Sequence, residues 1–206
     1  MSYIPKDAVT QSFRSNKGVL TPNQIIELDN ENKFTKYGQL ELIQTQSASD
    51  VNSIEFSSIQ ENVYDVHFLT VTNFSAVSSS CGGQLQLLES GVAKTSGYEF
   101  AYQQADLSSG SPFTEQKTTS GTSMVSFDFD PVTPRNTYAY IYNAGDNTKY
   151  TYITAHYVGI NNSNLVFRFG SAVCDVASNV DGIKIVSSNS NNFNIDNVSL
   201  YGIRFA

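Results

Sequence analysis

The chain has 206 residues, enough for one domain of ordinary size or two small ones. Only 15% of them are charged, against a usual share of about 25%, so Ser, Thr, Asn and Gln must carry much of the polar surface. The formal net charge is -7, and without a basic patch there is no electrostatic basis for binding a phosphate backbone. The composition therefore argues against a nucleic-acid partner and is typical of a β-rich protein that assembles.

Residues 1–11 show neither the basic region nor the apolar run of a secretory signal. No apolar stretch approaches the roughly 18 to 20 residues that span a bilayer, so we expect no membrane partner. The two cysteines, Cys81 and Cys174, lie outside any CxxC or Cys/His spacing, which indicates neither a disulfide framework nor a zinc site. The run Cys81-Gly82-Gly83 is expected in a loop.

Residues 1–36 lack the alternation of the later chain and hold a cluster of basic side chains: Lys6, Arg14, Lys17, Lys33 and Lys36. We interpret residues 1–36 as an N-terminal arm and residues 37–206 as the main domain. Within the arm, Thr21 is placed as a helix N-cap, Pro22 suits the first helical position, and Gln24 completes a capping box. This pattern predicts a short helix over about residues 22–30, which needs a docking partner to be stable.

From Gln39 onward the hydrophobic period is two, as in half-buried strands. Ile54 and Phe56 alternate with polar residues, as do Val125, Phe127 and Phe129. Further strands are expected over residues 40–43, 63–72, 84–89, 98–103, 137–143, 149–157, 165–169, 182–186 and 197–205.

About eleven short strands, separated by polar turns and without intervening helices, indicate antiparallel pairing in two packed sheets. The predicted fold is an all-β, jelly-roll-like sandwich preceded by the arm and its helix. A pair of immunoglobulin-like domains is the alternative. The chain has no Trp and no Pro- or Gly-rich linker, both of which argue against that alternative.

Residues suited to catalysis are few. His67 and His156 each lie in an apolar strand; Asp65 shares a face with His67, but no nucleophile elbow accompanies the pair, so structural histidines are expected. Asp128 and Asp130 offer two carboxylates at a strand end, without an EF-hand loop for calcium or an opposing acid for glycoside hydrolysis. We expect no metal site, no cofactor and no enzymatic activity.

Tyrosine is the most unusual feature of the sequence. Tyr138, Tyr140 and Tyr142 share one face of a strand, and Tyr150 and Tyr152 follow on the next. Packing in the core is the favoured interpretation, and burial at a subunit interface is the next. Stacking on a host surface glycan is the third, because Trp is absent.

Both ends of the chain resemble structural proteins of tailed bacteriophage particles, especially phages of marine bacteria and cyanobacteria. Residues 15–28, SNKGVLTPNQIIEL, are similar to a start in which an SxxGV segment and a short helix precede a β domain. Residues 37–46, YGQLELIQTQ, and 198–203, VSLYGI, are also similar. The resemblance implies a virion component, assembled in the host cytoplasm, with no enzymatic motif to carry over.

These observations predict a structural protein that decorates or protrudes from the phage head. Its arm would contact other virion proteins through apolar and basic side chains: Phe13, Arg14, Lys17, Leu20, Ile25 and Leu28. A homo-oligomer, with a trimer as the expected symmetry, is part of this prediction. The alternative is a carbohydrate- or receptor-binding module of the tail or fibre, which would leave aromatic rings exposed around a concave site.

Overall fold

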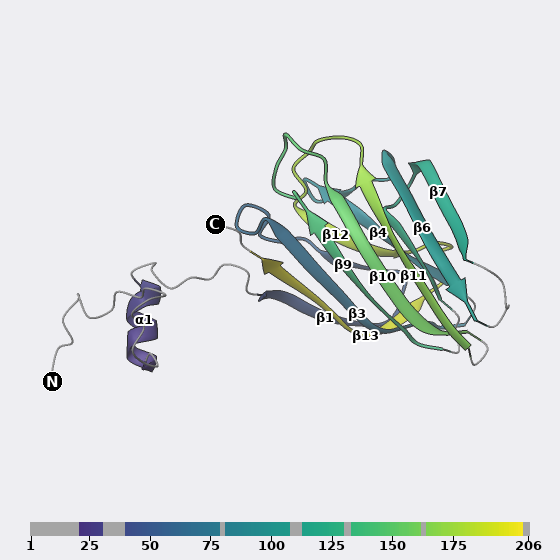
Figure 1. Ribbon diagram of the computed structural model, residues 1–206, viewed down its shortest axis with the longest axis horizontal. Coiled ribbons are helices and arrows are strands. Elements are labelled where there is room, and N and C mark those ends of the chain that lie inside the picture. The colour runs from purple at the N-terminus through teal and green to yellow at the C-terminus, as the bar shows by residue number, and fades with distance from the viewer. Residues whose placement is uncertain are drawn as a thin grey trace. The chain divides into compact units, whose positions relative to one another are not determined.

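A computed structural model of the chain describes residues 21–30, 40–78, 81–107, 113–129, 133–161 and 164–203. The chain forms two compact units, Met1–Tyr37 and Gly38–Ala206. Figure 1 shows the helix of the first unit and the sheets of the second.

Helix α1 spans Pro22–Asn30, as the capping pattern predicts. The Thr21 N–H donates to Gln24 Oε1 at 2.8 Å, and the Gln24 N–H donates to Thr21 Oγ1 at 3.4 Å. Both reciprocal bonds of a capping box are therefore present, which confirms the predicted helix start. On this helix Leu28 is buried, whereas Ile25 and Ile26 are exposed.

In its described residues the second unit is almost entirely β-structure. Its strands are β1 (Glu41–Val51), β2 (Ser53–Phe56), β3 (Val66–Ala76), β4 (Cys81–Glu89), β5 (Val92–Ala93), β6 (Tyr98–Asp106), β7 (Thr114–Gly121), β8 (Val125–Phe129), β9 (Arg135–Tyr142), β10 (Tyr152–Asn161), β11 (Asn164–Cys174), β12 (Gly182–Ser187) and β13 (Phe193–Ile203).

The strands form two sheets that pack as a sandwich (Figure 1). An eight-stranded sheet has the order β1-β13-β3-β9-β10-β11-β6-β7, and a five-stranded sheet has the order β2-β12-β4-β5, with β8 paired to β4. All strand pairs in the described part of the chain are antiparallel. The predicted all-β sandwich is confirmed.

The first and last strands are nested as in a jelly roll. Strand β1 pairs with β13 in the larger sheet, and β2 pairs with β12 in the smaller one. Successive pairs wound into opposite sheets are typical of that fold. The meander β9-β10-β11 then widens the larger sheet, since its three strands pair in chain order.

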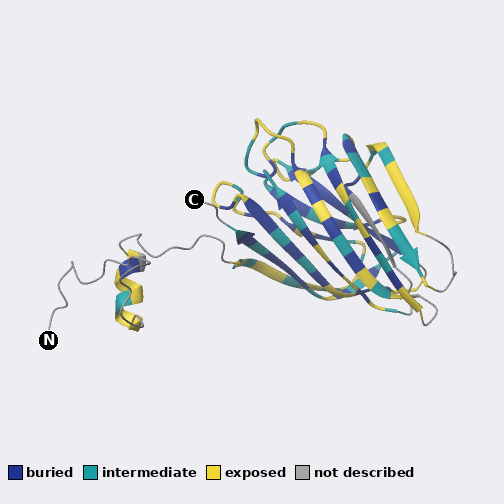
Figure 2. Ribbon diagram, viewed as in Figure 1, coloured by how far each residue is buried: buried dark blue, intermediate teal, exposed yellow. Residues whose placement is uncertain are grey.

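One continuous core lies between the sheets, so the alternative of two immunoglobulin-like domains is wrong. Buried and exposed residues alternate along the strands of the larger sheet (Figure 2). Phe56, Leu85 and Ile141 are fully buried, and the Phe74 and Phe193 rings pack with their centroids 4.6 Å apart. Burial of large side chains from both sheets supplies the main stabilisation of the fold.

The sequence-based prediction was wrong at the start of β4 and missed β7, because in both places strand pairing determines the structure. Cys81, Gly82 and Gly83, predicted as a loop, begin β4 and are buried, because Gly82 and Gly83 pair with β8 and Ser187 of β12 pairs with Gly83. Strand β7 (Thr114–Gly121) escaped prediction because its side chains are polar and mostly exposed. In the described part of the chain it is an edge strand, paired with β6 alone.

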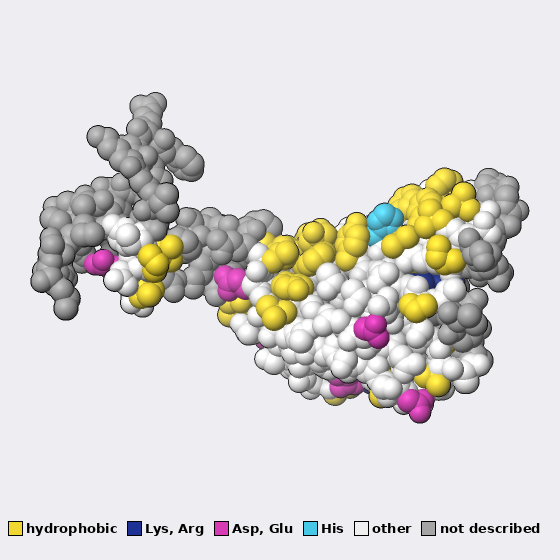
Figure 3. Space-filling view, turned by 90° about the horizontal axis from the view of Figure 1, so that it is seen from below, with side chains coloured by type: hydrophobic (Ala, Val, Ile, Leu, Met, Phe, Trp, Pro, Cys, Tyr) yellow, Lys and Arg dark blue, Asp and Glu magenta, His cyan; other side chains and the backbone are white. Residues whose placement is uncertain are grey.

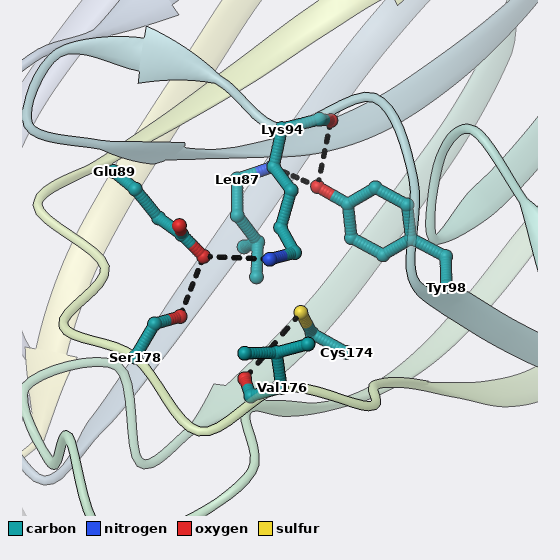
Figure 4. Close-up of polar contacts among 7 residues, drawn as sticks. All are labelled: Leu87, Glu89, Lys94, Tyr98, Cys174, Val176 and Ser178. Atoms are coloured by element: carbon teal, nitrogen blue, oxygen red, sulfur yellow. Dashed lines mark hydrogen bonds and ion pairs between the residues drawn. The ribbon is translucent and has the colours of Figure 1, made fainter.

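A small polar cluster joins the two sheets at one end (Figure 4). The Tyr98 hydroxyl of β6 donates to the Lys94 carbonyl at 3.0 Å and accepts the Leu87 N–H of β4 at 3.0 Å. Burial raises the pKa of Tyr98, so this hydroxyl stays protonated and able to donate. Glu89 Oε1 accepts a hydrogen bond from the Ser178 hydroxyl. It also forms an ion pair with Lys94, whose Nζ lies 3.1 Å away. This arrangement satisfies its own polar groups and serves to hold the sheets together.

Candidate functional site: an aromatic face on the larger sheet

The tyrosines of β9 lie on the outer face of the larger sheet. Thr137, Ala139 and Ile141 point into the core, so Tyr138, Tyr140 and Tyr142 alternate to the other side. Tyr138 is 42% exposed, and Tyr152 of β10, opposite Tyr142, is 46% exposed. The interpretation of these tyrosines as core residues is therefore wrong. In this strand both faces are apolar or aromatic, and period two alone does not tell which faces inward.

Rings from other strands extend this surface beyond the predicted tyrosines. Phe68 of β3 lies 4.6 Å from Tyr140 and 6.2 Å from Tyr201 of β13, centroid to centroid. His156 of β10 lies 5.7 Å from Tyr138 and 6.1 Å from Phe169 of β11. We call this surface the aromatic face; its members are Phe68, Phe113, Tyr138, Tyr140, Tyr142, Tyr152, His156, Phe167, Phe169 and Tyr201.

Figure 3 shows hydrophobic side chains gathered along one side of the sandwich, with a histidine among them. Phe113 and Phe169 are 55% and 42% exposed. Single exposed apolar residues are ordinary on protein surfaces, but a contiguous aromatic patch marks a binding surface. Tyr150 is also exposed, but it precedes β10 and is not among the rings in contact on this face.

The two histidines have different environments. His67 is fully buried, and its Nε2 lies 2.8 Å from the Ile59 carbonyl, whereas Asp65 beside it in sequence is exposed. His156 is half-buried on the aromatic face, with its Nδ1 3.3 Å from the Tyr138 hydroxyl. The interpretation as a packed structural histidine therefore holds for His67, and His156 belongs to the surface.

Burial of His67 predicts a loss of stability in mild acid. Desolvation lowers its pKa below the ordinary 6.5, although its bond to Ile59 and the nearby Glu61 act in the opposite direction. The unfolded chain takes up this proton near pH 6.5 and the folded chain only at lower pH. The free energy of unfolding should therefore keep its full value above about pH 6.5. As the pH drops below about 6.5 it should decrease, by at most about 1.4 kcal/mol per pH unit.

Urea unfolding at pH 7.5 and 5.5 tests this expectation. His67→Gln keeps an N–H for the Ile59 carbonyl and should remove most of the difference between the two pH values, while His156→Gln should retain it. Equal acid sensitivity in the parent chain and His67→Gln would show that another group is responsible.

A buried arginine lies on the inner side of the larger sheet, beneath the aromatic face. Arg168 of β11 is 4% exposed, and its guanidinium lies 4.1 Å from the Tyr102 ring centroid and 5.2 Å from that of Tyr157. Its Nε donates to Gln104 Oε1 at 3.0 Å. Stacking on aromatic rings and hydrogen bonding both offset part of the cost of burying this cation, and they connect β11 to β6 and β10 below the aromatic face.

Of the remaining predicted site residues, the structure describes two on helix α1 and leaves the others undescribed. Ile25 is 38% exposed and Leu28 5% exposed on α1. Phe13, Arg14, Lys17 and Leu20 lie outside the described residues, as do Asp130 and the side chain of Asp128.

Within the described ranges, no three His, Cys, Asp or Glu side chains lie close enough to share a metal ion. Cys81 and Cys174 are buried free thiols whose pKa values burial raises. No helix in the described part of the chain is both long and apolar enough to cross a membrane.

Comparison with known proteins adds no relative. No protein-family model, no curated protein and no solved structure matches this chain.

Proposed function

We propose that this chain is a non-enzymatic structural component of a tailed phage particle, in a head-decorating or head-protruding position and anchored by residues 1–36. The sandwich would be the body that the particle carries on its surface. Contacts to other virion proteins, and assembly into a homo-oligomer with trimeric symmetry, belong to the same proposal.

The aromatic face is the observation that carries the proposal. A chain with few charges exposes a broad set of rings on one side of its larger sheet, and such surfaces serve contacts with other molecules. The resemblance of residues 15–28, 37–46 and 198–203 to phage structural proteins supplies the setting. The separate first unit, Met1–Tyr37, suits an anchor.

Mass spectrometry of purified particles tests the proposal. In particles of the phage that encodes it, the chain should be present in many copies and should remain through density-gradient purification. A chain found only in the lysate of infected cells, and absent from purified particles, would refute a virion role.

A second candidate function is a carbohydrate- or receptor-binding module of the tail or fibre. The observation that favours it is an open depression in the aromatic face, lined by Tyr138, Tyr140, Tyr142, His156 and Phe169. Exposed rings around a concave site are what a recognition module requires.

A further inference from the structure

The depression in the aromatic face is one part of a longer groove. A second depression is lined by Glu99, Ala101, Lys117, Tyr152 and Ser171, and a third by Gln103, Glu115, Lys117, Phe169 and Ser171. All three share Ser171, and two share Ala101. They therefore adjoin one another across β9, β10, β11, β6 and β7.

Strand register explains why the groove runs across the strands. Its floor is a row of residues that pair in turn: Tyr140, Thr154, Ser171, Ala101 and Lys117. The three central side chains are small, while the row at one side holds Tyr138, His156, Phe169, Gln103 and Glu115, and the row at the other holds Tyr142, Tyr152, Val173 and Glu99.

These rows give the groove its size. Paired strands lie about 4.8 Å apart, so a row over five strands is roughly 19 Å long. The two flanking rows are four residues apart along each strand, or roughly 13 Å between their backbones. This length admits several linked sugar rings, and the large side chains of the flanking rows form its walls.

The chemistry of floor and walls suits a carbohydrate. Thr154 and Ser171 are exposed, and their hydroxyls can both donate and accept hydrogen bonds. The rings of Tyr138 and Phe169 in one wall, and that of Tyr140 at the end of the floor, offer flat faces next to these hydroxyls. A sugar ring presents the same two surfaces, hydroxyl groups at its edge and C–H groups on its faces.

Charge selects among the occupants of such a groove. Among the described residues that line it, the Asp, Glu, Lys and Arg side chains are Glu99, Glu115 and Lys117, and the whole chain carries a net charge of -7. The two carboxylates outnumber the one ammonium group of Lys117, so the groove repels an acidic chain on balance, and two copies meeting face to face would bring together surfaces with the same excess of negative charge. A neutral glycan avoids both penalties, and carboxylate oxygens accept bonds from its hydroxyls.

We propose that the groove over Thr154, Ser171 and Ala101 binds a neutral oligosaccharide lying across the strands. The inference deepens the second candidate function and rests on it for its biological setting. It does not depend on where in the particle the chain is located, because binding is measured with the isolated full-length chain.

Calorimetric titration with hexasaccharides tests the proposal. The neutral probes are hexamers of glucose, mannose, galactose and N-acetylglucosamine, and the acidic probe is a hexamer of galacturonate. At least one neutral hexamer should bind with a Kd below about 1 mM, equivalent to about -4.1 kcal/mol. When that hexamer is added, the protein's backbone amide NMR signals that shift should centre on Ala101, Thr154 and Ser171. The galacturonate hexamer should bind at least about tenfold more weakly.

Matched variants locate the site. Phe169→Ala removes a wall and Ser171→Leu fills the floor, and each should weaken binding about tenfold or more. Tyr150→Ala removes an equally exposed ring outside the groove and should leave the Kd within about twofold, a change below 0.5 kcal/mol by the same conversion. Thermal unfolding of each variant checks that the fold is retained.

Three results would overturn the proposal: no neutral hexamer binds at millimolar concentration, the acidic hexamer binds best, or Tyr150→Ala weakens binding as much as Phe169→Ala. Sedimentation of the free chain adds a fourth, since self-association lost in Phe169→Ala would assign the face to a second copy. Any of these results leaves detection of the chain in purified particles unaffected, so the groove and the virion role fail separately.

Discussion

Removal of residues 1–36 is expected to leave a folded sandwich that no longer enters phage particles. Among the described residues, the buried residues of the core cluster all belong to Gly38–Ala206, and Ile54 is the first of them in chain order. The truncated chain should therefore keep its β-sheet circular dichroism and a cooperative thermal transition. Its incorporation should fall below about a tenth of the full-length level, the ratio for a loss of about 1.4 kcal/mol of binding free energy.

A shorter deletion provides the control for this experiment. Removing residues 1–11 leaves Phe13, Arg14, Lys17 and α1 in place, so particles should incorporate that chain normally. Both chains are compared by immunoblot of gradient-purified particles formed in cells that lack the native copy. Normal incorporation of the chain without residues 1–36 would remove the basis for an N-terminal anchor.

Replacement of Phe193 by Ala is expected to have the largest effect on stability. Phe193 in β13 is fully buried and packs on Phe74 at 4.6 Å between ring centroids. Truncation of such a ring removes buried apolar area and leaves a cavity, at a cost of about 3–5 kcal/mol in the free energy of unfolding. Urea denaturation of the full-length chain measures this loss.

Phe169→Ala is the matched control, since it makes the same change on the outer face of the same sheet. Phe169 is 42% exposed and its contacts are with other surface rings, so its loss should cost about 1 kcal/mol or less. If Phe169→Ala lowered the free energy of unfolding as much as Phe193→Ala does, Phe169 would have to be buried. That result would contradict its position on the outer surface of the sheet.

Local features of the fold were predictable because their causes lie within a few residues. The capping bonds between Thr21 and Gln24 involve neighbours in sequence, and the start of α1 follows from them. Alternation identified most strands in the same way. Strand β7 and the start of β4 were missed because pairing partners, rather than their own apolar residues, hold them in the sheets.

The aromatic face was only partly predictable. The tyrosines of β9 and β10 stood out, since they flank one turn, but their direction depends on which side the smaller sheet covers. Phe68 meets Tyr140 through the pairing of β3 with β9, and Phe169 meets His156 through the pairing of β10 with β11. Rings so far apart in the chain join only when strand order and register are known.

A cryo-electron-microscopy map of the phage particle tests whether residues 1–36 anchor this chain to the particle surface. In that map the sandwich should lie on the outside of the particle, with residues 1–36 packed against another virion protein and the groove over Thr154 and Ser171 open to solvent. A map in which residues 1–36 make no contact with the particle would contradict the N-terminal anchor, whereas a virion protein seated on the aromatic face would contradict the glycan groove alone.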